Sequence, residues 1–412
     1  MDKQNVVFLG FTIPEELAHD YFRKDPNPAI QTHKFAWSFA RSLATHNQVI
    51  LISSVPIQNY PLVDKLFIQG GSFKDQDFNG YFIPFINILV LKHFFRLFFG
   101  FFILLYVCVF KKPEVIFVHG VHTPYLILAN FFKLFGFKSA IILTDPAGVE
   151  LDTDSFLSKF LKKIDKSIVG FFINNADILI SLAPKLVENY DKKIIKLNFP
   201  GILNKSFNEG ILANHLEKEN NQTFRIVYAG GLHEIYGIKK LVNAILTLPP
   251  DVSIKMLFLG KGDQLEYIKQ SSKVDSRVGY GGFLSNEELI PELLKADLLI
   301  NPRPTSLEFS GLSFPSKLIE YLATGIPVLT TKIVSIPSCY EEFFYYIDDE
   351  SESGIQQAIV RVMAIDPVER KLVASNAQKF IQQEASEVAV GEKINYMIKQ
   401  LLRRGEKNYV FR

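Results

Sequence analysis

Lys317 and Glu320 are the two residues whose types and spacing most directly suggest ligand binding. They belong to residues 314–328, Phe-Pro-Ser-Lys-Leu-Ile-Glu-Tyr-Leu-Ala-Thr-Gly-Ile-Pro-Val, which predict a loop, a short helix that Gly325 ends, and a strand. Residues three apart on a helix share a face. An ammonium suits phosphate and a carboxylate suits ribose hydroxyls, and a helix N-terminus already favours anions. The alternative is that the two side chains pair with each other on an ordinary surface helix.

The elements that would position these residues belong to the second of two alternations of strand and helix. In the first half, strands are expected over residues 6–10, 49–53, 115–119, 140–144, 178–181 and 194–198. In the second half, they are expected over residues 224–229, 255–259, 278–283, 298–301 and 327–331. Alternation of this kind implies right-handed βαβ units. The expected fold class is α/β, with two Rossmann-like, doubly wound parallel-sheet domains facing a cleft.

The length of 412 residues exceeds one hydrophobic core and favours two large domains. We expect an N-terminal domain over residues 1–203 and a C-terminal domain over residues 224–385. Residues 204–223 are polar and lack an apolar period, which predicts a linker. Residues 386–412 predict a C-terminal helix that can pack back on the N-terminal domain.

Composition excludes several classes of protein. Lys plus Arg number 45 against 43 for Asp plus Glu, a formal charge of +2 that argues against nucleic-acid binding by field alone. The two cysteines, Cys108 and Cys339, favour a reduced compartment and argue against disulfides or structural zinc. The apolar run over residues 6–10 is too short for a signal peptide, so we expect a cytoplasmic protein.

Two segments suggest contact with a membrane. Residues 94–110 are almost wholly apolar apart from Arg96, but they lie at the lower limit for a span, and a strand follows directly. We therefore favour a helix packed on the sheet over a span. Residues 156–172 combine an apolar stripe with four lysines, which is typical of a helix on the inner membrane surface. The alternative is a solvated lysine face over a stripe that packs in the core.

Several strand ends in the second half carry groups suited to phosphate. Gly230 and Gly231 follow one strand, Gly260 and Lys261 the next, and Arg303 a third, with Glu308 shortly downstream. The carboxyl ends of parallel strands meet at one sheet edge, where open α/β sheets bind ligands. Each loop alone is more often a plain turn, but together with Lys317 and Glu320 they predict a phosphate site. Two capping boxes, at Asp263 with Glu266 and Ser285 with Glu288, predict helix starts.

Several motifs of the second half occur together in one known family. They are Tyr228-Ala-Gly-Gly-Leu, Tyr236-Gly-Ile, Gly260-Lys-Gly, Asn301-Pro-Arg-Pro and, above all, the run from Ser313 to Val328. With them the chain resembles, over nearly its whole length, the family-four retaining glycosyltransferases of the two-lobed type called GT-B. Its Pro-Ser-Lys-x-x-Glu-Tyr signature is similar to that of a subgroup that assembles bacterial polysaccharides. The resemblance implies a nucleotide diphosphate sugar as donor, a lipid-linked glycan as acceptor, and no metal or other cofactor.

The resemblance also assigns roles to residues of the second domain. It implies that Glu320 holds the donor ribose and that the backbone of Phe314, Pro315 and Ser316 contacts the sugar and diphosphate. Two departures are clear. Leu312 stands where the family has an acid for the sugar hydroxyls, with Glu308 as the nearest substitute. Gly231 and Tyr236 replace the family's two diphosphate cations, for which Arg303 and Lys317 are the candidates.

In the first domain, the resemblance brings the backbone at Gly10 close to the donor phosphates, an approach that only glycine permits. His119 and His122 follow one strand and Asp145 follows the next. The family's histidine beside the sugar is matched by Thr144, which leaves Asp145 as a base or acceptor anchor, followed by His119. Two other functions remain open: a nucleotide-sugar epimerase of the same fold, and a non-catalytic binding partner of another transferase.

Overall fold

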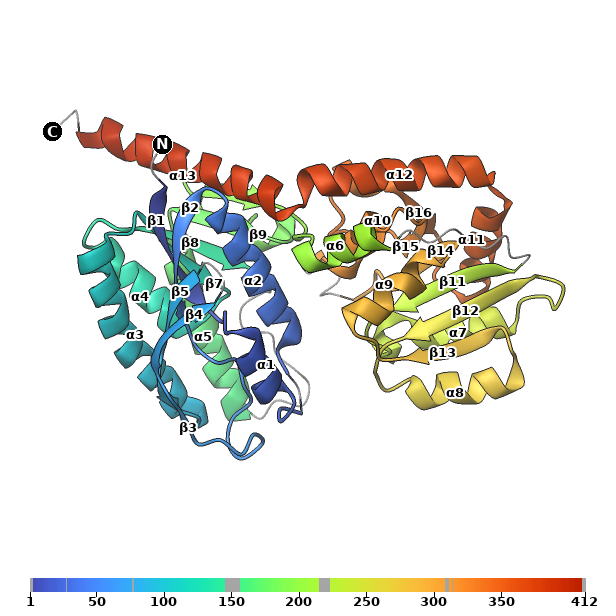
Figure 1. The fold of residues 1–412 in the computed structure, drawn as a ribbon, viewed down its shortest axis with the longest axis horizontal. Helices are drawn as coiled ribbons and strands as arrows, with labels where there is room; N and C mark the ends of the chain where they lie inside the picture. Colours follow the sequence, from blue (N-terminus) through green and yellow to red (C-terminus); the bar gives the residue numbers. More distant parts are fainter. Residues whose placement is uncertain are drawn as a thin grey trace. The chain divides into compact units, whose positions relative to one another are not determined.

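The structure, a computed structural model, describes residues 3–26, 28–75, 78–144, 156–214, 223–307, 311–312 and 314–409. The chain divides into two compact units, coloured along the sequence in Figure 1. Unit 1 comprises Met1–Ile202 and Glu387–Arg412, and unit 2 comprises Leu203–Ser386. The last helix therefore belongs to the same unit as the N-terminal half of the chain.

Unit 1 is built on a mainly parallel sheet. Within the described residues its strand order is β10-β9-β8-β7-β1-β2-β5-β4, and only β4 runs antiparallel to its neighbour. The strands of this sheet are β1 (Gln4–Gly10), β2 (Asn47–Ser53), β4 (Gly71–Asp75), β5 (Phe78–Phe82), β7 (Val115–His119), β8 (Lys138–Leu143), β9 (Ile178–Ser181) and β10 (Ile195–Asn198). A separate antiparallel pair joins β3 (Phe67–Ile68) to β6 (Phe85–Ile86).

Helices cover both faces of this sheet. The helices of unit 1 are α1 (Glu15–Phe22), α2 (Ile30–Ala44), α3 (Leu89–Lys111), α4 (Thr123–Lys133), α5 (Phe156–Asn174) and α13 (Glu387–Tyr409), with a 3-10 turn η1 (Pro184–Leu186). α2 and α13 share a core with alternate strand residues such as Phe8 and Phe117. α3 packs against α4, and α4 packs against α5.

Unit 2 is built on a doubly wound sheet, and each described pair of neighbouring strands in it is parallel. Its described order is β13-β12-β11-β14-β15-β16. The strands are β11 (Phe224–Ala229), β12 (Ile254–Leu259), β13 (Val278–Gly282), β14 (Leu298–Asn301), β15 (Val328–Thr331) and β16 (Phe344–Ile347). The helices are α6 (Lys205–Ala213), α7 (Ile238–Leu246), α8 (Leu265–Val274), α9 (Asn286–Leu294), α10 (Lys317–Ala323), α11 (Glu352–Ala364) and α12 (Pro367–Glu384), with 3-10 turns η2 (Glu234–Tyr236) and η4 (Ser338–Phe343). One core lies under α6, α9, α10 and α12, and the other lies under α7, α8 and α11.

The α/β class with two Rossmann-like sheets is confirmed, and each strand expected from the sequence occurs, with its ends shifted by one or two residues at most. Two local expectations differ from the structure. α6 occupies much of the segment expected to be a linker, because Phe207 and Ile211 enter the core of unit 2. Ser285 and Glu288 form the expected capping box, but α8 begins after Gln264 without a side-chain cap. Asp263 instead binds the loop after β11.

Candidate functional site

The loops that follow β11 and β12 are packed too closely for any residue but glycine at two positions. Gly230 follows β11 with φ +151°, and Gly260 follows β12 with φ +138°. A Cβ on Gly260 would lie 1.8 Å from the backbone oxygen of Gly230. The loops are also joined by a hydrogen bond from Leu232 N to Lys261 O at 2.7 Å. The expected convergence of these loops at the carboxyl edge of the sheet therefore occurs.

The ammonium of Lys317 lies directly against the Gly230 loop. A Cβ on Gly230 would come within 1.9 Å of Lys317 Nζ. Nζ donates a hydrogen bond to the Tyr228 hydroxyl at 3.0 Å and lies 4.4 Å from the centre of that ring. Burial lowers the pKa of Lys317 to about 8; Tyr236 and Glu320 oppose this shift, and the charge of Arg303 adds to it. Lys317 thus donates to Tyr228, and its ammonium lies at the end of β11.

Arg303 lies in the same cluster and comes from a different loop. It follows β14, is 8% exposed, and its guanidinium carbon lies 5.7 Å from the centre of the Tyr236 ring. Burial lowers its pKa, while Tyr236 and Tyr228 favour the charged form. Two cations from separate elements therefore lie close enough to repel each other at one sheet edge. An anion between them would remove that repulsion.

Tyr321 fixes the position of α10 relative to the end of β11. Its hydroxyl accepts a hydrogen bond from Ala229 N at 2.7 Å and donates one to Ala229 O at 3.0 Å. Tyr228 in turn donates to Gly231 O at 2.8 Å. Both hydroxyls are buried, and burial raises the pKa of each tyrosine. The helix that carries Lys317 and Glu320 is thereby tied to the glycine loop.

The remaining predicted residues of unit 2 differ in exposure. Glu320 is partly buried in the first turn of α10, near enough to Lys317 to raise the pKa of the lysine. Phe314 and Pro315 are buried and Ser316 is exposed at the N-cap of that helix. Lys261 is exposed, with its ammonium 4.1 Å from the centre of the Phe283 ring.

In unit 1, Gly10 and His119 pack against each other at the ends of β1 and β7. A Cβ on Gly10 would lie 2.9 Å from the Cβ of His119, so close packing alone explains the glycine. His119 is 2% exposed and its ring contacts Phe8 and Phe35. Burial lowers the pKa of His119 to about 4, so the imidazole is neutral at pH 7. This placement favours a packing role over contact with a substrate hydroxyl.

Two predicted residues, Asp145 and Glu308, lie outside the described residues. Their roles stay predictions, as do the ligand contacts assigned to the others. Across the described ranges, no three His, Cys, Asp or Glu side chains gather in a way that would hold a metal ion.

Sequence reasoning did not single out the aromatic part of this cluster. Tyr228 lies at the end of a buried strand and Tyr321 in the middle of a helix, where aromatic residues usually indicate core packing. The available signal was Tyr236, which stands where the resembled family has a cation. In the structure its ring lies beside Arg303.

Comparisons with known proteins agree with this architecture. Residues 223–364, within unit 2, match the family described as glycosyl transferases group 1. An uncharacterized glycosyltransferase from Methanocaldococcus jannaschii is 22% identical over 250 residues, which are 58% of this chain and 62% of that protein. This chain thus spans less than two thirds of the length of that curated relative.

Solved structures extend the match to the whole fold. Sucrose-phosphate synthase from Thermosynechococcus elongatus superposes with a TM-score of 0.65 at 16% identity, covering 98% of this chain and all of that one. The Anabaena protein Alr3699/HepE, solved in complex with UDP, gives a TM-score of 0.61 at 14% identity, covering 96% of this chain and all of that one. The solved structures show the GT-B fold with two Rossmann-like domains, and the family match shows similarity to glycosyltransferases over residues 223–364.

Proposed function

We propose that this protein is a retaining glycosyltransferase that moves a sugar from a nucleotide diphosphate sugar to a lipid-linked glycan during assembly of a bacterial surface polysaccharide. Unit 2 would bind the donor, and unit 1 would bind the acceptor. The observation that carries the donor assignment is the approach of Lys317 and Arg303 at the carboxyl edge of the sheet of unit 2. This edge lies within the part of the chain that matches the group 1 family.

The reaction needs a place for a departing diphosphate. The bond between the anomeric carbon and the diphosphate oxygen breaks, and its electron pair stays on the diphosphate. The acceptor oxygen forms the new bond on the same face of the sugar and its proton leaves with the diphosphate or through solvent. Arg303 and Lys317 would stabilise the growing negative charge, which electrostatic contacts of this kind do without a metal or a protein nucleophile.

Glu320 is the proposed ribose ligand. It lies one helical turn after Lys317 on α10, and Tyr321 holds that helix against the end of β11. A carboxylate accepts hydrogen bonds from ribose hydroxyls. The Anabaena structure was solved with UDP, so UDP is the first nucleotide to test with this chain.

The outer face of α3 supports contact with a membrane surface. α3 packs on the sheet through one stripe, and its other side exposes a row of phenylalanines, including Phe94, Phe98 and Phe102 at 58%, 47% and 53%. Among the described residues, α3 is the helix that is long and apolar enough to cross a membrane, judged by length and composition alone. Because it also packs beside α4 and carries buried basic residues, we propose a peripheral helix on the cytoplasmic face of the cell membrane.

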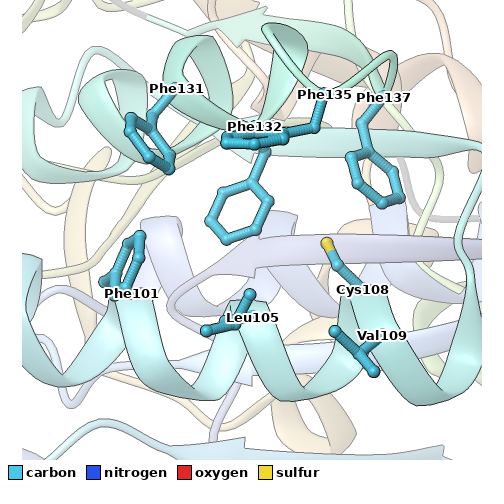
Figure 2. A pocket seen from close by; sticks show the side chains of 8 residues that line it. All are labelled: Phe101, Leu105, Cys108, Val109, Phe131, Phe132, Phe135 and Phe137. Carbon is cyan, nitrogen blue, oxygen red and sulfur yellow. The ribbon is translucent and has the colours of Figure 1, made fainter.

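An apolar pocket opens between α3 and α4 (Figure 2). Its volume is about 240 Å³, and all of its lining side chains are apolar or a thiol. They are Phe101, Leu105, Cys108 and Val109 from α3, facing Phe131, Phe132, Phe135 and Phe137. Burial raises the pKa of Cys108 to about 12, so the thiol is neutral. Such a pocket suits a hydrocarbon chain and adds support for a lipid-linked acceptor.

The α5 helix adds further support for surface contact. Ile164, Ile168 and Phe171 were expected to form an apolar stripe beside lysines, and they are exposed. Val169 and Ile173 fill the core in their place. Exposed apolar residues next to Lys163 and Lys166 are typical of a helix on an anionic membrane surface.

The test of the donor site is the double variant Arg303→Met and Lys317→Met. We expect it to keep its circular dichroism spectrum and lose both UDP binding and sugar transfer to membrane extract. Methionine keeps most of the apolar length of each side chain, so loss of charge is the main change. Near-normal transfer by the folded double variant would refute the assignment.

Two other functions give different results in the same assay. An epimerase would convert the donor without any acceptor or membrane extract. A non-catalytic partner would bind UDP, lose that binding in the double variant, and turn over no donor under either condition. Donor turnover that requires the extract and is lost in the double variant supports the transferase.

A further inference from the structure

A second group of buried cations lies in unit 1, at the carboxyl edge of its sheet. Arg96, on α3, is 4% exposed. Its Nη2 donates to the backbone oxygen of Val55 at 3.0 Å, just after β2, and Nη1 lies 3.5 Å from His122 Nε2, just after β7. Its guanidinium lies 4.5 Å from the centre of the Phe85 ring. Loops after β2 and β7, the two strands on either side of β1, therefore contact one arginine.

Lys92 lies on the same face of α3, one turn earlier, and is 9% exposed. Like charges four residues apart on a helix repel each other. Burial, followed by the charge of Arg96, lowers the pKa of Lys92 to about 8, and Asp25 opposes the shift. Burial and the charges of Arg96 and Lys92 lower the pKa of His93 to about 4, opposed by Asp165. The pKa of His122 is lowered well below its usual value by burial, Arg96, His93 and Lys92.

The described residues do not neutralise this charge by direct pairing. Ion pairs within unit 1 include Arg41 with Glu387 and Lys133 with Asp177, and in the part of the chain that the structure describes none involves Arg96 or Lys92. The Nε of Arg96 is buried and has no hydrogen-bond partner in the described part of the chain. Asp25 accepts from Gln58 N at 2.8 Å, and Asp165 accepts from the Thr123 hydroxyl at 2.5 Å.

A buried cation without an anionic partner is costly, and binding of an anion reduces that cost. The guanidinium fork matches the oxygens of a phosphate, and open α/β sheets bind ligands at this edge. We propose that Arg96, Lys92 and His122 bind a phosphate or diphosphate group of the acceptor at the carboxyl edge of unit 1. The identification of this ligand as the acceptor rests on the proposed transferase function, whereas phosphate binding at this site does not.

The phosphate can come from a lipid or from a soluble sugar phosphate. The same helix that carries Lys92 and Arg96 exposes Phe94, Phe98 and Phe102. A phosphate held at the start of α3 would therefore have apolar surface beside it. Geranyl diphosphate represents the lipid source, glucose 6-phosphate the soluble source, and inorganic pyrophosphate the bare group.

The experiment measures binding of these three probes by calorimetry. It uses the full chain carrying Arg303→Met and Lys317→Met, so that the donor site of unit 2 does not contribute. In that background we add Lys92→Met or Arg96→Gln, and as a control Lys111→Met, an exposed lysine at the other end of α3. Loss of one charge-assisted contact predicts roughly 10- to 100-fold weaker binding for Lys92→Met, and little change for Lys111→Met.

Each outcome decides the proposal. Tight geranyl diphosphate binding with weak glucose 6-phosphate binding assigns a lipid phosphate, and the reverse assigns a soluble one. Failure of all three probes to bind at millimolar concentration, or equal binding to the Lys92→Met and Lys111→Met variants, overturns it. If Arg96→Gln does not fold, Lys92→Met still decides. Failure of the proposed function is detected in a separate measurement. It would show as equal UDP affinity of the wild-type protein and the Arg303→Met, Lys317→Met double variant.

Discussion

Replacing Lys317 with methionine should make the ligand-free protein more stable and, at the same time, weaken nucleotide binding at the proposed donor site. Burial and Arg303 lower the pKa of Lys317 from 10.5 to about 8. A shift of about 2.5 units at about 1.36 kcal/mol each corresponds to roughly 3 kcal/mol against the charged form in the folded state. Lys317 is only partly buried, and the variant loses a hydrogen bond to Tyr228 worth about 1 kcal/mol. We therefore expect a net gain of about 1 kcal/mol for Lys317→Met at pH 7.

The sign of the pH dependence follows from the lowered pKa. Between pH 8 and 10.5 the folded protein binds fewer protons at Lys317 than the unfolded chain, so the wild-type protein gains stability as the pH rises. The advantage of Lys317→Met should therefore be largest below pH 8 and shrink towards pH 10.5. Thermal unfolding at several pH values, without ligand, measures this difference.

Binding of UDP should change in the opposite direction. Loss of one charge-assisted contact to phosphate costs about 1.5 to 3 kcal/mol, which predicts roughly 10- to 100-fold weaker binding by calorimetry at pH 7. The matched control is Lys255→Met, an exposed lysine near the start of β12, at the other edge of the sheet. A Lys317→Met protein that is less stable than wild type at pH 7, or that binds UDP with unchanged affinity, would contradict the reasoning.

Two further predictions concern the glycine loop and the outer face of α3. Gly230→Ala adds a Cβ at a positive φ and within 1.9 Å of Lys317 Nζ, so it should displace the ammonium and weaken UDP binding about tenfold or more. Calorimetry checks this, and wild-type affinity would count against a role for Lys317. Phe98→Glu with Phe102→Glu places two carboxylates on the exposed face and should reduce co-sedimentation with anionic vesicles several-fold. Unchanged sedimentation with a normal circular dichroism spectrum would argue against α3 as the contact.

The parts of the fold that sequence predicts well are the strands buried on both faces. Val115–His119 and Ile178–Ser181 are short, continuous apolar runs, and both occur with the expected bounds. The edge strand Gly71–Asp75 was missed because its exposed, polar residues carry no apolar alternation. The cap predicted at Asp263 failed because His233 and Glu234, from the loop after β11, bind that carboxylate.

The candidate site was predictable where it depends on topology. Strand order brings the loops at Gly230, Gly260 and Arg303 to one edge, and parallel pairing follows from the alternation of elements. Side-chain direction was not predictable, because Lys317 turns to Tyr228 and the glycine loop through contacts between distant residues. The cations of α3 were missed for a different reason. Arg96 within a run of phenylalanines suggested an interruption of an apolar helix, and sequence does not tell which face it occupies.

The first and last residues of unit 2 lie beside each other. Leu203 N donates to Ala385 O at 2.7 Å, and Leu203 pairs with Ser386 in a short parallel bridge. Unit 2 is thus an insertion whose two ends close on themselves, while α13 completes unit 1 through Val390 and Ile394. Because its two ends are adjacent, such an inserted domain can be replaced by another without changing the backbone of the domain that carries it. Under the proposed function, grafting a homologous unit between residues 202 and 387 should change the donor preference of this chain.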